Sequence, residues 1–216
     1  MRNPTNHTRP PVTDPRAWWR FLCWITGTRI ALCGDLPANR TAARRQLAEW
    51  AAAGITHIVD VRGEHSDEEF VRREAPGLTY VWLPTHDNGG AQDPRWFEHG
   101  VAGILAILDD PDARVVVHCH MGVNRAPSLA FAALLGLGFD PIAALDAIRT
   151  ARPIAGILYA ADAVEWWADR DGLMPADIAR DLVEAWHDAN PVDLRWIISR
   201  IRKAEVSDFD GLPEVA

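Results

Sequence analysis

Short apolar runs alternate with longer helical patterns along most of this chain. The short runs have the length of buried strands and lie at residues 29–33, 55–61, 78–83 and 114–117. In the segments between and after them, apolar residues recur every three or four positions, as on one face of a helix, at 41–53, 96–108, 126–137, 142–150 and 157–170. This alternation predicts an α/β fold with a central, mostly parallel sheet of four to five strands flanked by helices.

Local signals refine the first part of this pattern. Thr41 is a residue type that caps helix N-termini, and Gly54 tolerates the left-handed backbone that ends many helices, so we expect the first long helix between them. Nearer the N-terminus, an apolar cluster predicts a short helix that closes over the core. Its members are Trp18, Trp19, Phe21, Trp24 and Ile25.

The two ends of the chain differ from its middle. Residues 1–16 are polar and contain four prolines, so we expect a flexible N-terminal arm. Two further helical patterns, at 175–189 and 191–203, follow the α/β pattern. We expect a main domain over 17–172 and a C-terminal helical extension, 173–216, packed on that domain. A docking or dimerisation surface is the alternative interpretation of the extension.

Composition narrows the class of protein. Apolar residues make up 48% and charged residues 24% of the 216 residues, as in soluble globular proteins. The net charge of −8 argues against a nucleic-acid partner and against an anionic membrane surface. Three cysteines are too few for a disulfide framework, and the N-terminus lacks the apolar core of a signal peptide, so we expect a cytoplasmic protein. The oligomeric state stays open.

The connection between the last predicted strand and the helix after it carries the strongest chemical signal. Residues 118–125 read HCHMGVNR. Backbone N–H groups of such a loop, together with the positive end of the following helix, form a site for an oxyanion, and the same field favours a thiolate at Cys119. Arg125 can hold two oxygens of a tetrahedral oxyanion through its planar fork. A nucleophile, an anion site and a guanidinium at this spacing indicate covalent phosphoryl transfer.

His-Cys, five residues and Arg, with Gly122 in the middle, resembles the signature loop of the cysteine-dependent protein phosphatases. The flanking sequence resembles the dual-specificity branch, and segments 54–61, 96–108 and 148–153 are similar to further elements of that family. The resemblance covers about residues 28–168. It implies a phosphotyrosine-phosphatase-like fold, with the residues after it as extra C-terminal helices and residues 17–172 as the catalytic domain.

The resemblance also assigns roles to three residues. Cys119 is the expected nucleophile and Arg125 the expected clamp on the transition state. Asp87 lies 32 residues before Cys119, where the family has its general acid, and we expect it to protonate the leaving group and later deprotonate water. Asp93 and Asp60 are the competing acids, although for Asp60 a pairing with Arg62 or a contact to the loop is favoured.

Further loop residues are expected to bind the phosphoryl group with Arg125. They are His120, Met121, Gly122, Val123 and Asn124. His118 is expected to support the loop through hydrogen bonds without acting as a base. Arg152 is expected either to brace the loop or to contact the phosphate. No metal and no other cofactor is implied, because the covalent chemistry uses the cysteine, histidine and aspartate set.

The family usually has Ser or Thr directly after the loop arginine, where its hydroxyl helps the sulfur to leave. Here that position is Ala126, and Ser128 lies two residues further on. Because this hydrogen bond is lost, we expect a slower hydrolysis of the phosphoenzyme. The expected function is a phosphoprotein phosphatase that acts on phosphotyrosine and phosphoserine or phosphothreonine, while RNA 5′-phosphate and glucan phosphate substrates stay open.

Two other functions compete with this interpretation. The first is a pseudophosphatase that binds phosphorylated partners with little turnover, and Ala126 is its support. The second is a rhodanese-like sulfurtransferase, because Asp60-Val61-Arg62 resembles a strand end of that family. The sulfurtransferase loop has a shorter spacing between cysteine and arginine, and Asn124 stands where that arginine would fall. The sequence therefore favours the phosphatase.

Overall fold

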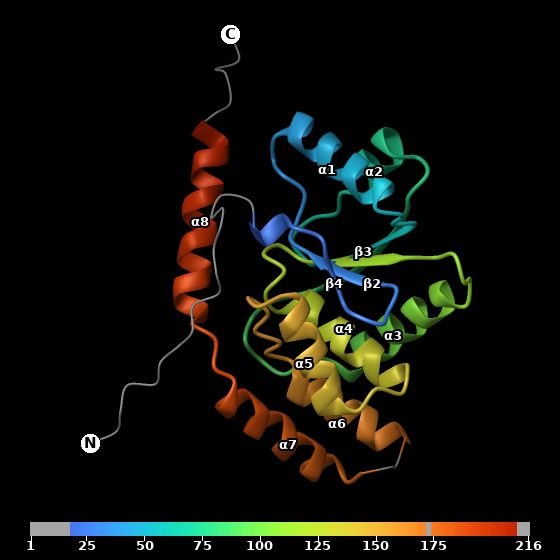
Figure 1. Ribbon diagram of the computed structural model, residues 1–216, viewed down its shortest axis with the longest axis vertical. Coiled ribbons are helices and arrows are strands. Elements are labelled where there is room, and N and C mark those ends of the chain that lie inside the picture. Colours follow the sequence, from blue (N-terminus) through green and yellow to red (C-terminus); the bar gives the residue numbers. More distant parts are fainter. Residues whose placement is uncertain (1–17, 172–173, 211–216) are drawn as a thin grey trace.

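The computed structural model describes residues 18–171 and 174–210 (Figure 1). The arm expected over residues 1–16 lies outside the described residues. One five-stranded sheet forms the centre, in the order β1-β2-β5-β3-β4. The strands are β1 (Cys23–Trp24), β2 (Ile30–Cys33), β3 (His57–Arg62), β4 (Thr79–Thr85) and β5 (Val115–His118). Only β1 runs antiparallel to its neighbour, which confirms the mostly parallel α/β sheet.

β5 occupies the middle of the sheet and pairs with β2 on one side and β3 on the other. Its four residues, Val115 to His118, are all buried. Three consecutive β-branched valines suit this position because both faces of the strand are covered by helices. The carboxyl end of β5 leads directly into residues 119–124, where open parallel sheets bind their ligands.

Helices cover both faces of the sheet (Figure 1). One face carries α1 (Arg40–Ala52) and α2 (Glu68–Glu74), whose apolar side chains form a cluster with Ala31, Ile58 and Val116 of the strands. The other face carries a larger set, in which α4 is central and wholly buried over residues 125–135. The helices of this set are α3 (Pro94–Leu108), α4 (Arg125–Gly136), α5 (Pro141–Ala151) and α6 (Ala160–Asp171).

Two expectations about where helices begin need correction. The side chain of Asn39, and not that of Thr41, caps α1, because it accepts hydrogen bonds from the N–H groups of Thr41 and Ala42. Gly54 does follow α1 with the expected positive φ of 85°. The helix expected over 157–170 begins only at Ala160, because Ile157 has a φ of 54°, which is outside the helical range.

The short helix expected for the apolar cluster near the N-terminus is also wrong in part. Only η1 (Trp18–Arg20) is helical, as a single 3-10 turn, and Phe21 is 51% exposed. Cys23 and Trp24 form β1 instead, because their backbone pairs with Leu32 and Ala31 of β2. Pairing with the edge of the sheet therefore outweighed the local helical pattern.

Two helices follow the α/β unit. α7 (Ala176–Ala189) packs on α6 and α5. α8 (Leu194–Asp210) stands along the side of the domain at which β5 ends (Figure 1). Its residues Ile197, Ile201 and Ala204 share an apolar cluster with Trp19 and Val123. No helix in the described part of the chain is both long enough and apolar enough to span a membrane.

Candidate active site

The loop after β5 places Cys119 beside the N-terminus of α4. Cys119 and Arg125 are each only 2% exposed. In the described part of the chain, the backbone N–H groups of residues 121–125 donate no hydrogen bond to another backbone group. Buried N–H groups are rarely left without a partner, and the N-terminus of a helix favours negative charge. The loop therefore has the donors that an oxyanion needs.

Gly122 is the residue that lets this loop close tightly. Its φ is 63°, a left-handed conformation that glycine adopts without strain. A Cβ atom at this position would lie 2.3 Å from Nη2 of Arg152 and 2.5 Å from the carbonyl oxygen of Cys33. Any side chain at residue 122 would therefore displace the loop or the groups packed behind it.

Arg152 braces the loop from behind. Its Nε donates to the carbonyl oxygen of Gly122 at 2.6 Å, and its Nη2 donates to that of Met121 at 3.1 Å. Further hydrogen bonds reach the carbonyl oxygens of Trp19 and Phe21. The side chain is 1% exposed and its donors are directed to the backbone. Of the two roles considered for Arg152, the geometry matches the brace and not the phosphate contact.

His118 and Asp60 lie beneath the loop. Nε2 of His118 is 3.8 Å from Oδ2 of Asp60, and burial lowers the pKa of His118. Burial alone would raise the pKa of Asp60, but His118 and Arg62 outweigh it and hold that pKa below its usual range. Asp60 pairs with Arg62 at 2.6 Å. Asp60 is therefore a buried structural carboxylate rather than an acid for catalysis.

Arg125 is held by two acceptors, and the way it is held leaves one edge free. Its Nη1 donates to Oε2 of Glu64 at 2.8 Å and to the carbonyl oxygen of Thr85 at 3.0 Å, while Nη2 donates to Oε1 of Glu64 at 2.9 Å. A guanidinium has five N–H groups, so Nε–H and one Nη2–H remain. These two lie on the same edge of the planar fork, which is the edge that binds two oxygens of an oxyanion. Nε is buried and has no hydrogen-bond partner in the described part of the chain.

Glu64 was not predicted from the sequence. Burial alone would raise the pKa of its carboxyl, but the hydrogen bond from Arg125 outweighs burial and lowers that pKa. Glu64 therefore stays ionised at neutral pH and orients the guanidinium. The sequence feature that could have pointed to Glu64 is its position two residues after Arg62, at the carboxyl end of β3.

Asp87 lies on the loop between β4 and α3 and reaches the same site. Its Oδ1 accepts hydrogen bonds from Nδ2 of Asn124 and from the hydroxyl of Tyr159, each at 2.8 Å. Its Oδ2 lies 3.7 Å from Nε of Arg125. The competing acid Asp93 instead caps α3 by accepting a hydrogen bond from the N–H of Arg95. The structure thus brings Asp87, and not Asp93, to the signature loop.

Asn124 and Ser128 hold the loop in place. Besides its contact to Asp87, Asn124 accepts a hydrogen bond from the N–H of Leu158 at 2.7 Å. The Ser128 hydroxyl lies 3.3 Å from Oδ1 of Asn124 and accepts a hydrogen bond from the N–H of Tyr159 at 3.3 Å. The Ser128 hydroxyl is therefore engaged with Asn124 and Tyr159, away from the position that the missing hydroxyl at Ala126 would occupy.

A cavity of about 620 Å³ opens above Cys119. Asp87, Arg125 and four of the loop residues expected to bind substrate line it, and these four are His120, Met121, Val123 and Asn124. Gly122, His118 and Arg152 lie behind it. Residues of α8 line the cavity as well, which the sequence did not predict, since this helix lies beyond the region of resemblance.

His120 is engaged by α8 rather than free. Its Nε2 forms a hydrogen bond with Oε1 of Glu205, and its Nδ1 lies 3.8 Å from Oδ2 of Asp35. The hydrogen bond that His120 donates to the Glu205 carboxylate raises the pKa of His120 above its usual value. Burial raises the pKa of Asp35 to about 6. In the part of the chain that the structure describes, no group of three or more His, Cys, Asp or Glu side chains could hold a metal ion.

Part of this chain is similar in sequence to known proteins. No protein-family model matches this chain. Dual specificity protein phosphatase 26 of Homo sapiens is 26% identical over 127 residues, which cover 57% of this chain and 54% of that protein. The Mus musculus protein of the same name is 28% identical over 104 residues, covering 47% and 44%. The chain thus spans about half the length of the curated relatives it matches.

Solved structures with a similar fold have low sequence identity. Tk-PTP in its active form is 22% identical, with a TM-score of 0.56 over 70% of this chain and 99% of that one. Human DUSP28 is 18% identical, with a TM-score of 0.54 over 76% and 95%. PTPMT1, solved in complex with PI(5)P, is 19% identical, with a TM-score of 0.54 over 70% and 96%. Sequence relatives and structural neighbours agree that this chain has the fold of the dual-specificity phosphatase-like cysteine phosphatases.

Proposed function

We propose that this protein hydrolyses phosphomonoesters of phosphotyrosine and of phosphoserine or phosphothreonine in proteins, through a cysteinyl-phosphate intermediate. The observation that carries the proposal is the free edge of Arg125. Its buried Nε has no partner in the described part of the chain, and Arg125 lines the same cavity as Cys119. A site with an unpaired guanidinium edge next to a buried thiol fits a phosphoryl group better than a neutral ligand.

In the first step, the Cys119 thiolate attacks phosphorus in line with the leaving oxygen. An S–P bond forms and the P–O bond to the substrate breaks. The loop N–H groups and the Nε and Nη2 of Arg125 stabilise the charge on the three equatorial oxygens. Asp87 donates its proton to the leaving oxygen, which departs as a neutral alcohol or phenol.

In the second step, water attacks the phosphoenzyme. Asp87, now a carboxylate, takes the proton from this water as the new P–O bond forms and the S–P bond breaks. Inorganic phosphate leaves and Cys119 returns as a thiolate. Asn124 and Tyr159 keep the Asp87 carboxyl close to the loop through both steps, since both donate to its Oδ1.

The deciding experiment measures phosphate release without metal between pH 5 and 8, from para-nitrophenyl phosphate and from phenyl phosphate. We expect Cys119→Ser to abolish release from both. Asp87→Asn is expected to slow the hydrolysis of phenyl phosphate by about 10²–10⁴-fold and that of para-nitrophenyl phosphate less, because the more basic leaving group needs the proton more.

Asp93→Asn is the matched control. Asp93 lies at the end of the same loop, and its side chain caps α3. It should not change the ratio between the two substrates. Equal losses on both substrates in Asp87→Asn would contradict its role as general acid. A folded wild type that binds tungstate and releases no phosphate would instead favour the pseudophosphatase, for which Ala126 is the specific observation.

A further inference from the structure

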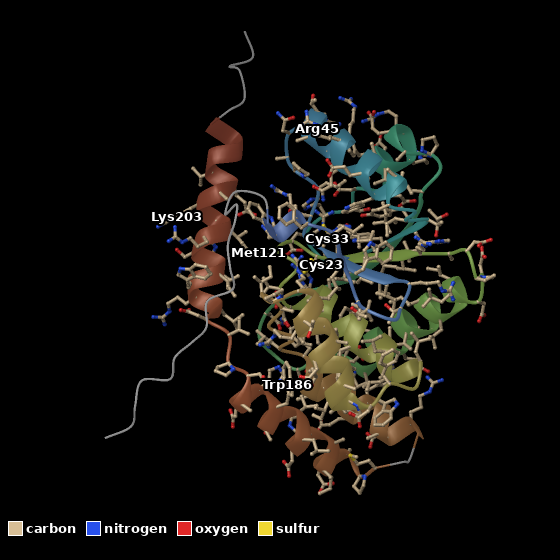
Figure 2. All side chains as sticks on the ribbon, in the orientation of Figure 1. Cys23, Cys33, Arg45, Met121, Trp186 and Lys203 are labelled. Atoms are coloured by element: carbon tan, nitrogen blue, oxygen red, sulfur yellow. The ribbon has the colours of Figure 1, made fainter. Side chains whose placement is uncertain are left out.

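α8 forms one wall of the cavity above Cys119. Leu194, Ile198, Arg202 and Glu205 line the cavity, and their spacing of four, four and three residues places them along one stripe of the helix. The neighbouring stripe, with Ile197 and Ile201, packs into the apolar cluster beside the loop. Figure 2 shows Met121 on the side of the domain that faces α8. Because one stripe anchors the helix, the other is held in place over the site.

The cavity is larger than the phosphoryl group alone requires. Its volume of about 620 Å³ is in the range of sites that enclose whole ligands. Leu158, Leu194 and Ile198 give the cavity an apolar part. A substrate therefore meets α8 with the groups that flank its phosphate.

Arg202 differs from the other charged groups that line this cavity. Glu64 is paired with Arg125, Glu205 with His120, and Asp87 accepts from Asn124. The Arg202 side chain is exposed, and it makes no hydrogen bond or ion pair within residues 18–171 and 174–210. Arg202 is thus a second guanidinium at the cavity, on α8, that pairs with no carboxylate within the described residues.

We propose that Arg202 is a specificity-determining residue, which binds a second anionic group on the phosphoprotein substrate, either a carboxylate or a second phosphate close to the hydrolysed one. The inference rests on the proposed function and extends it to the substrate class. A guanidinium suits both kinds of anion, because its fork matches the geometry of carboxylate and phosphate oxygens.

A peptide fits the surroundings better than a membrane surface. Anionic leaflets attract clusters of Lys and Arg, whereas this chain carries a net charge of −8, and Glu64, Asp87 and Glu205 share the cavity with Arg202. One arginine among these carboxylates selects a single anionic group and does not attract an extended anionic surface.

The test measures peptide binding to Cys119→Ser, which needs no turnover, by fluorescence anisotropy. Three phosphotyrosine peptides are compared, one with neutral flanks, one with glutamates on both sides, and one with an added phosphoserine. We expect the two acidic peptides to bind about threefold to tenfold more tightly than the neutral one. This ratio corresponds to the binding free energy of one solvent-exposed charge pair or slightly more. Arg202→Ala in the same background should bring this ratio close to one.

Two further variants keep the interpretation specific. Arg200→Ala removes the same charge from the same helix, but the Arg200 guanidinium stacks on Trp196, so the preference should persist. Arg202→Lys should retain part of the preference. The comparison between the glutamate and phosphoserine peptides identifies the anion that Arg202 binds.

The inference is wrong if Arg202→Ala leaves the preference unchanged, or if Cys119→Ser shows no preference for the acidic peptides. It is also wrong if phosphoinositide vesicles displace the peptides and the peptides do not differ among themselves. Failure of the proposed function shows separately, as a lack of phosphate release by the wild type.

Discussion

Single residues decide how the signature loop works, and the free edge of Arg125 is the clearest case. Glu64 and the carbonyl oxygen of Thr85 occupy three of its five N–H groups and leave the two that share an edge. The guanidinium is therefore oriented before any anion arrives. Preorganised donors of this kind stabilise a transition state without the cost of reorienting them.

Glu64→Gln tests this orientation. A side-chain amide can accept from only one Nη group and presents its own N–H to the other, so the guanidinium loses its fixed position. We expect the affinity for tungstate to fall by about tenfold, the effect of one lost hydrogen bond between charged groups, with a similar fall in kcat/KM. Glu68→Gln, an exposed acid in the first turn of α2, is the control. Tighter tungstate binding in Glu64→Gln would mean that Glu64 competes for Arg125 and does not position it.

Ala126 is the residue that departs from the family pattern. It is fully buried as the second residue of α4 and offers no hydroxyl to the sulfur of Cys119. We expect Ala126→Ser to speed hydrolysis of the phosphoenzyme by about tenfold to a hundredfold, because a hydrogen bond to a thiolate stabilises the leaving group. Rapid-quench kinetics of a single turnover separates this step from the attack.

Ala130→Ser is the matched control for that experiment, since Ala130 is equally buried one helical turn later. Its hydroxyl is too far along α4 to reach the sulfur. If hydrolysis is no faster in Ala126→Ser than in Ala130→Ser, the missing hydroxyl does not limit turnover.

At the scale of elements, α8 is tied to the loop by a polar contact and an apolar face. The polar contact joins His120 to Glu205, while Asp35 and Glu64 also lie near the His120 ring. The apolar face includes Ile197 and Ile201, which are fully buried. Because the apolar face anchors the helix, the polar contact adjusts how firmly it is held.

The stability that this contact gives to α8 depends on pH. Glu205 raises the pKa of His120 in the folded protein. The contact therefore contributes fully to the free energy of unfolding below about pH 6.5, the ordinary pKa of histidine, and this contribution is lost as the pH rises through the raised pKa. We expect Glu205→Gln to lower the free energy of unfolding by less than about 1 kcal/mol at pH 6.5, and by a smaller amount at pH 9. Urea unfolding at the two pH values gives this difference.

Glu184→Gln is the control for the pH dependence. Glu184 pairs with Arg180 on α7, and arginine does not titrate in this range, so its effect should be equal at both pH values. A Glu205→Gln effect that is also independent of pH would show that the charge on His120 does not hold α8.

At the scale of the whole molecule, the sequence predicts what local patterns determine. Alternating strand and helix periods predicted the α/β sheet. The resemblance of the sequence to a known family singled out Asp87, Cys119 and Arg125, and the structure brings these three residues together around one cavity. β1 was missed because a strand of two residues has no period of its own and forms only through its partner.

The partners of the site were missed for a related reason. Glu64, Tyr159 and Arg202 come from three distant segments, and each is ordinary in its local sequence. Only the packing of β3, α6 and α8 around the loop gives them a role. The location of the candidate site was therefore predictable from the signature loop and its resemblance, whereas the residues that orient this loop depend on tertiary contacts.

The brace formed by Arg152 has a consequence for the newly synthesised chain. Arg152 is made 33 residues after Cys119, which corresponds to about two to seven seconds at usual rates of translation. Until it emerges, the carbonyl groups of Met121 and Gly122 have no guanidinium to hold them, and they cannot yet be tied to Trp19. The nascent chain thus carries Cys119 before the loop around it can be braced, and it completes this site only after residue 152 has been added.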